Sequence, residues 1–177
     1  MSIEDYILAT FSNIFQILVV WRFVRIFFFP RVEKREEMAG YIGYLVFCLA
    51  VFFGFQNPLY NMVTSWGALL LLTVAIYEGT WKKKALIATL IWTVHVMCDA
   101  VASYLFYDYM GGDMIPQYIG IFTALFLFIC QIVVEKFMRD RGKGDLNHSH
   151  IILLGVPAVS AVMLGVLVVT DLNHRVL

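Results

Sequence analysis

Residues 85–106 read ALIATLIWTVHVMCDAVASYLF. Within this stretch there is no Lys, Arg or Glu, and the only two residues whose charge matters near neutral pH are His95 and Asp99. A run of about 20 predominantly apolar residues is long enough to cross the hydrocarbon core of a bilayer as an α-helix. We therefore predict a membrane-spanning helix here, with ionisable side chains inside the membrane.

Five further apolar runs accompany this one. They cover residues 6–29, 40–55, 62–77, 119–137 and 151–170. The tripeptide Gln56-Asn57-Pro58 lies between the second run and the third. This predicts a tight helical hairpin with Pro58 in the first turn of the later helix, where its missing N–H would be unpaired anyway. We predict an all-α fold, a polytopic membrane bundle of six transmembrane helices that forms one domain over residues 1–177.

The composition excludes two classes of protein. The chain is 61% hydrophobic and 15% charged, with a mean hydropathy of +0.79, which is outside the range of soluble globular domains. Thirteen Lys and Arg balance thirteen Asp and Glu, so there is no net basic field to bind nucleic acid. We interpret the three cysteines as small core residues and His148 and His150 as solvated, and we predict no metal site and no cofactor.

Basic residues indicate the orientation. All Lys and Arg except Arg175 lie near the inner end of the first run or in the loops after the first, third and fifth runs. By the positive-inside rule this side is cytoplasmic, which places the N-terminus outside. The first run lacks a positive leader segment, so we expect it to be retained as a helix. Six spans would leave the C-terminus outside as well, and Arg175 followed by two apolar residues suggests the start of a seventh span.

A polar stripe crosses the fourth run. It consists of Trp92, His95, Asp99 and Ser103, whose spacings of three, four and four residues place them on one helical face. A carboxylate at the centre of a membrane helix costs about 2.5–3.5 kcal/mol, so we expect Asp99 to face the bundle interior, protonated or paired with His95. The stripe is either a ligand contact or switch, or a packing hydrogen bond between helices. A Ser-His-Asp hydrolase is disfavoured because His95 and Ser103 are about 12 Å apart along one helix, and we predict no catalytic residues.

Residues 107–118 form an aromatic, methionine-rich outer loop in this interpretation. Tyr107 and Tyr109 are candidate contacts for an apolar ligand or peptide, with a loop lying on the membrane surface as the alternative. Arg22 and Arg25 are close enough to the cytoplasmic end to reach the headgroups, so we interpret them as anchors in the lipid bilayer.

Two segments resemble a known family. Arg22-Phe-Val-Arg25 with its Phe-rich continuation, and Tyr77-Glu-Gly-Thr-Trp-Lys-Lys-Lys84 with Asp99 in the following helix, resemble the N-terminal membrane region of GHKL-type sensor histidine kinases, including the agr-like peptide receptors of Gram-positive bacteria. The resemblance implies a sensing module in a bacterial cell membrane and an extracellular peptide or small amphipathic ligand. We also expect a homodimer and, in a full-length protein, a cytoplasmic kinase domain or response regulator as partner.

The sequence also departs from that family. None of the four histidines begins a His-Asp phosphoacceptor box, and Asn57 and Asn61 have the spacing of a nucleotide-binding box but fall in an outer turn. The chain is thus at most the sensing half, and not itself an enzyme. One alternative is the substrate-binding subunit of an energy-coupling-factor vitamin transporter, which has six spans and this size but keeps both termini inside. Another is an assembly or immunity membrane protein without a ligand.

Overall fold

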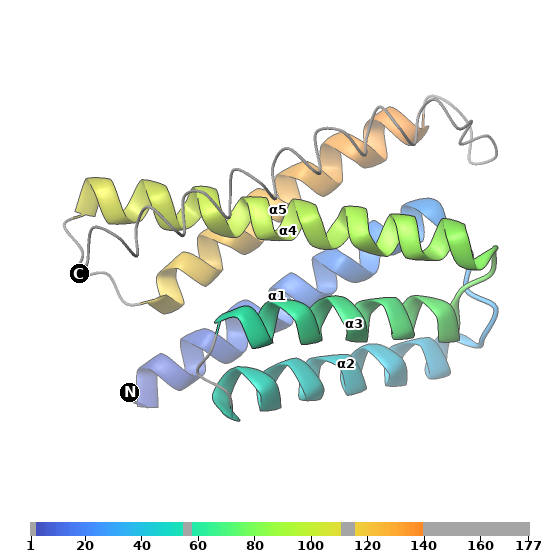
Figure 1. Ribbon diagram of the computed structural model, residues 1–177, viewed down its shortest axis with the longest axis horizontal. Coiled ribbons are helices and arrows are strands. Elements are labelled where there is room, and N and C mark those ends of the chain that lie inside the picture. The colour runs from blue at the N-terminus through green and yellow to red at the C-terminus, as the bar shows by residue number, and fades with distance from the viewer. Residues whose placement is uncertain (1–2, 55–57, 111–115, 140–177) are drawn as a thin grey trace.

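The computed structural model describes residues 3–54, 58–110 and 116–139, which form five helices (Figure 1). They are α1 (Ile3–Phe27), α2 (Lys34–Gly54), α3 (Pro58–Ile76), α4 (Trp81–Met110) and α5 (Pro116–Arg139). Helices α1, α2, α4 and α5 are long and apolar enough to cross a membrane, and α3 has a shorter apolar stretch. The all-α prediction is confirmed. Six helices are not, because the sixth predicted span, residues 151–170, lies outside the described residues.

Helix α2 begins six residues before the predicted span of 40–55. Residues 34–39 form the first turns of the helix and include four charged residues. Glu36 and Glu37 lie near the helix N-terminus, where negative charge complements the helix dipole. The backbone N–H of Glu33 also donates to Glu36 Oε2 at 3.3 Å, which satisfies a donor at the helix start. These charged residues were predicted as a loop, and the helix nevertheless includes them. Pro58 opens α3, as predicted.

Helix α4 is the longest element, with 30 residues. It extends to Met110, so Tyr107 and Tyr109 belong to a helix and the prediction of a loop at these positions is wrong. The physical reason is that residues 81–110 contain no glycine or proline, the two strongest helix breakers, whereas Gly111 follows directly. The centre of the predicted outer loop, residues 111–115, lies outside the described residues.

The helices form a closed ring in which neighbours along the chain also pack in space. Helix α1 packs most extensively against α5, α5 against α4, α4 against α3, and α2 between α3 and α1. The core lies where α1, α4 and α5 meet and contains fully buried Val24, Ile91 and Leu127. Many large apolar side chains face outward, including Phe11 and Leu71, which are 63% and 69% exposed. An apolar exterior on this scale suits contact with lipid and, together with four helices of membrane-spanning length, indicates a membrane protein.

One end of the bundle collects the basic residues. The end of α1, the start of α2, the end of α3, the start of α4 and the end of α5 all lie at the right of Figure 1, and we call this the basic end. Its members among the described residues are Arg22, Arg25, Arg31, Lys34, Arg35, Lys82, Lys83, Lys84, Lys136 and Arg139.

Backbone hydrogen bonds join the two connections at the basic end. Pro30 and Tyr77 form an antiparallel bridge. The N–H of Arg31 donates to Ile76 O at 2.9 Å, and the N–H of Glu78 donates to Phe29 O at 3.0 Å. Gly79 has a φ of 123°, which side chains rarely tolerate, and it completes the turn into α4. The α1–α2 and α3–α4 connections are therefore held together as one unit.

Candidate functional site

The predicted polar stripe on α4 makes hydrogen bonds with two neighbouring helices, α3 and α5. The Trp92 indole N–H donates to Met62 O of α3 at 3.1 Å. On the other side, the Thr123 hydroxyl of α5 donates to Asp99 Oδ1 at 2.9 Å. Ser103 is half-buried, one turn further along α4. The stripe residues thus contact both flanking helices instead of converging on one centre.

Asp99 is exposed, whereas the sequence predicts that it faces the bundle interior. The interior line of α4 runs through Ile91, Cys98 and Ala102, which are at most 5% exposed. Successive helical residues point about 100° apart, because a turn holds 3.6 residues, so Asp99 is turned away from the line that contains Cys98. Its carboxylate nevertheless contacts α5, because it accepts the hydrogen bond from the Thr123 hydroxyl.

His95 lies one helical turn before Asp99 and is half-buried. The two side chains interact electrostatically, but among the described residues the hydrogen bond to Asp99 comes from Thr123 and not from His95. The Thr123 hydroxyl also lies 3.0 Å from Ile119 O, and it has a single hydrogen to share between the two acceptors. Asp99 therefore competes with the α5 backbone for one donor.

A second polar cluster, which the sequence analysis missed, lies at the basic end. It is centred on Glu37 of α2, whose side chain is only 1% exposed. Three groups approach Glu37 Oε1: the Trp21 indole N–H at 2.9 Å, the Tyr77 hydroxyl at 2.7 Å and Arg25 Nε at 3.2 Å. One buried carboxylate thus joins α1, α2 and the connection between α3 and α4.

The hydrogen bonds of this cluster have a defined direction. Tyr77 uses its only hydroxyl hydrogen for Glu37, so Tyr41, whose oxygen lies 3.0 Å from that of Tyr77, is the donor between the two tyrosines. Burial raises the pKa of Tyr77, which keeps its hydroxyl protonated as a donor. The chain of donors runs from Tyr41 through Tyr77 to Glu37.

Aromatic packing completes the cluster. The Arg25 guanidinium lies over the Trp21 ring, 5.0 Å from its centroid, and the Tyr41 ring meets the Trp21 ring edge-on at 6.5 Å. Glu37 Oε2, in contrast, is buried and has no hydrogen-bond partner among the described residues. Within the part of the chain that the structure describes, the carboxylate is therefore bound through one oxygen only.

A sequence signal for this cluster existed. Trp21 and Arg25 are four residues apart on α1, and Glu37 and Tyr41 are four residues apart on α2, so each pair lies on one helical face. Opposite charges on two consecutive helices indicate a possible pair, but spacing alone does not show that Tyr77 joins them.

Helices α1 and α5 approach closely in the half of the bundle away from the basic end. A Cβ atom on Gly120 would lie 2.7 Å from Ser12 Oγ, closer than real contacts allow. The Gln16 amide donates to Gly120 O at 3.1 Å, across the same interface. A side chain at this position would therefore require at least the Ser12 hydroxyl to move.

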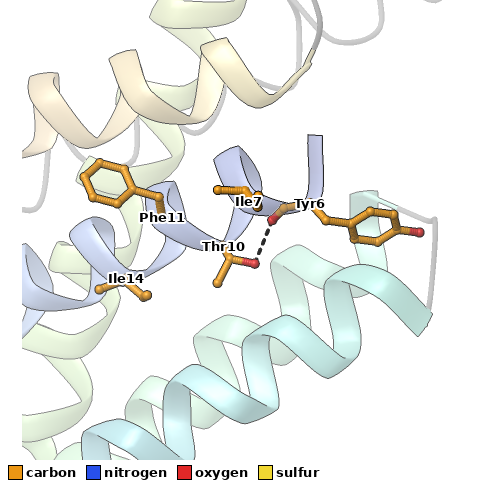
Figure 2. A pocket seen from close by; sticks show the side chains of 5 residues that line it. All are labelled: Tyr6, Ile7, Thr10, Phe11 and Ile14. Carbon is orange, nitrogen blue, oxygen red and sulfur yellow. Dashed lines mark hydrogen bonds between the residues drawn. The ribbon is translucent and has the colours of Figure 1, made fainter. Parts of the chain in front are cut away.

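A shallow apolar hollow lies on the first turns of α1 (Figure 2). Its volume is about 380 Å³, and its lining consists of Tyr6, Ile7, Thr10, Phe11 and Ile14. The Thr10 hydroxyl donates to Tyr6 O at 2.7 Å, so it is satisfied within the helix. Such a surface suits a hydrocarbon chain better than a polar ligand.

Comparisons of the chain with protein-family models, curated proteins and solved structures each found no match.

Proposed function

We propose that this chain is the membrane-embedded sensing module of a bacterial sensor kinase. In this proposal the N-terminus is outside, the basic end is cytoplasmic, and an extracellular peptide or small amphipathic molecule changes the packing of the bundle. The chain forms a homodimer and passes the change to a kinase domain or response regulator in the cytoplasm. The chain itself senses and does not catalyse.

The Glu37 cluster is the observation that carries the proposal. A buried ion pair is a poor device for stability alone, because apolar residues of similar volume stabilise as well or better. Here the pair joins α1 and α2 to the α3–α4 connection, at the end where the signal would leave the membrane. A movement of any one of these elements must break or rearrange bonds to Glu37, which makes the cluster suited to transmission.

The Asp99–Thr123 bond supplies a second element that can change state. Asp99 follows the first residue of α4 by 18 positions, which corresponds to about 27 Å along the helix from the basic end. Its bond to Thr123 is in competition with the α5 backbone, so a ligand with a donor for Asp99 would favour a different arrangement of α4 and α5.

Coupling between these two positions can be tested without knowing the ligand. The purified chain is labelled with 5-fluorotryptophan, and the ¹⁹F resonance of Trp21 is assigned with Trp21→Phe. We expect Asp99→Leu to shift the Trp21 resonance, because the indole donates to Glu37. Leu71→Asn, at an exposed position of α3, is the control and should leave it in place. An unchanged Trp21 resonance in Asp99→Leu would refute coupling between Asp99 and the basic end.

The kinase assignment has a separate test, which is the genomic sequence after Leu177. An open reading frame that continues through a further apolar span into a His-Asp box and a nucleotide-binding domain is the expected result. A stop codon with genes for transporter ATPases alongside would refute the proposal and favour the vitamin-transport subunit.

A further inference from the structure

Helix α1 presents one continuous exposed face along its length. Its apolar members are Ile7, Phe11, Ile14 and Leu18, which are between 39% and 63% exposed. Arg22 and Arg25 continue the same face, because successive members are three or four residues apart. We call these six residues the α1 outer face. It is apolar for most of its length and carries two guanidinium groups where it reaches the basic end.

From this pattern we infer that the α1 outer face binds one anionic phospholipid, with the phosphate on Arg22 and Arg25 and an acyl chain along Leu18, Ile14 and Phe11. The inference requires only that α1 spans a membrane, and it stands independently of the proposed sensing function.

The two arginines lie at the right depth for a phosphate. The apolar stretch of α1 is Tyr6–Phe27, so both guanidinium groups project from its last turns and must extend toward the headgroups to remain hydrated. Adjacent turns place their Cβ atoms about 5–6 Å apart, close enough for both to contact one phosphate. Arginine is suited to this ligand because its planar fork binds phosphate oxygens in pairs.

Both arginines keep N–H donors available for a ligand beside the contact that each makes within the protein. Arg25 contacts Glu37 through Nε, and its side chain is 40% exposed. This contact, together with the Trp21 ring below it, orients the guanidinium while the terminal nitrogens remain for a ligand. Arg22 Nη2 lies 3.4 Å from Glu135 Oε2, with both side chains about half-exposed, so this pair is weak.

The apolar part of the face has the length of one acyl chain. Ile14 lies eight residues before Arg22, which corresponds to about 12 Å along the helix, and Phe11 lies about 16 Å away, close to the 15 Å of half a hydrocarbon core. The hollow of Figure 2 begins at Ile14 and Phe11, where the chain would end. Charge at one end and an apolar path of this length fit a phospholipid and not a soluble anion.

The test compares lipids retained by the purified chain. The chain is purified in detergent with an equal mixture of phosphatidylglycerol and phosphatidylcholine, and bound lipid is counted by native mass spectrometry. We expect preferential retention of one phosphatidylglycerol. Arg22→Gln should lower its retention about fivefold, because one basic residue near the surface contributes about 1 kcal/mol toward an anionic lipid. For Arg25, the double variant Arg25→Gln/Glu37→Gln avoids leaving a buried carboxylate unpaired and should lower retention similarly.

Matched controls separate a site from a general charge effect. Lys82→Gln removes an exposed positive charge from the same end of the molecule and should leave retention unchanged. Leu18→Asn should weaken binding of the long-chain lipid, whereas Leu71→Asn on α3 should not. An equal loss in Lys82→Gln would show that the surface potential alone attracts the lipid. Displacement by inorganic phosphate, or no preference for phosphatidylglycerol, would also overturn the lipid site.

Discussion

Replacement of Glu37 by alanine is expected to destabilise the bundle more than any other single change at the basic end. The change leaves the Trp21 indole N–H and the Tyr77 hydroxyl without their buried acceptor, and it leaves Arg25 without its counter-charge. Removing one partner of a buried ion pair costs about 3–5 kcal/mol. Arg25 is 40% exposed and can turn to water or headgroups, so we expect about 3 kcal/mol, the lower end of that range.

Two further variants separate the contributions of charge and hydrogen bonding to this loss of unfolding free energy. Glu37→Gln keeps a carbonyl oxygen for Trp21 and Tyr77 and loses only the charge facing Arg25, so we expect a loss of about 1–2 kcal/mol. Tyr77→Phe removes one donor to Glu37 and leaves the Tyr41 hydroxyl without its acceptor, for a loss of about 1–2 kcal/mol.

The free energy of unfolding is measured by titration of the micelle-bound chain with sodium dodecyl sulfate, followed by circular dichroism. Glu33→Ala, at an exposed position just before α2, is the matched control and should change it by less than about 0.5 kcal/mol. Double-mutant analysis adds a sharper criterion. Arg25→Gln should lower the free energy of unfolding more in the unmodified chain than in a chain that already carries Glu37→Gln. Additive effects, or a Glu37→Ala loss equal to that of Glu33→Ala, would refute the assignment of Glu37 as the centre of the cluster.

Three other predictions concern the rest of the bundle. Asp99→Asn should preserve the unfolding free energy because an amide oxygen still accepts from Thr123, whereas Asp99→Leu should lower it by about 1 kcal/mol; equal values would show that the bond does not matter. Gly120→Val should cost about 1–3 kcal/mol in the same titration because its side chain would force α1 and α5 apart, while Gly67→Val, with open space around it, should cost less than 1. In a cysteine-free chain, Lys83→Cys should resist an impermeant thiol reagent in intact cells and react after permeabilisation; labelling in intact cells would reverse the proposed orientation.

The sequence predicted the existence of five of the helices because each contains an apolar run of sufficient length. It was wrong at the polar ends of α2 and α4. Hydropathy reports which residues suit the hydrocarbon core, whereas a helix ends where its backbone hydrogen bonds end. Residues 34–39 and 107–110 are polar or interfacial and remain helical, so both helices extend beyond the stretch that hydropathy detects.

The face that each helix turns inward was harder to predict. In a soluble protein an apolar face identifies the core, but in a bilayer the lipid side is equally apolar. On α4 the spacing places His95 and Asp99 on one face, but the interior line of the helix runs through Cys98, one position away from Asp99. The assumption that a membrane carboxylate must point inward is wrong for Asp99, which is exposed and accepts a hydrogen bond from Thr123 of the neighbouring helix α5.

Charge counting did not reveal the Glu37 cluster, since only Lys and Arg were counted to assign the orientation and Glu37 did not enter that count. The structure relates the two arginines of α1 to different neighbours: Arg25 pairs with Glu37 of α2, and Arg22 with Glu135 of α5. A rotation of α1 about its axis would therefore strain both pairs at once. Because the same helix carries the outer face to which we assign a phospholipid, a lipid held by Arg22 and Arg25 would oppose that rotation. The composition of the leaflet at the basic end would then bias the arrangement of the bundle, because a lipid would bind the two orientations of α1 with different affinities.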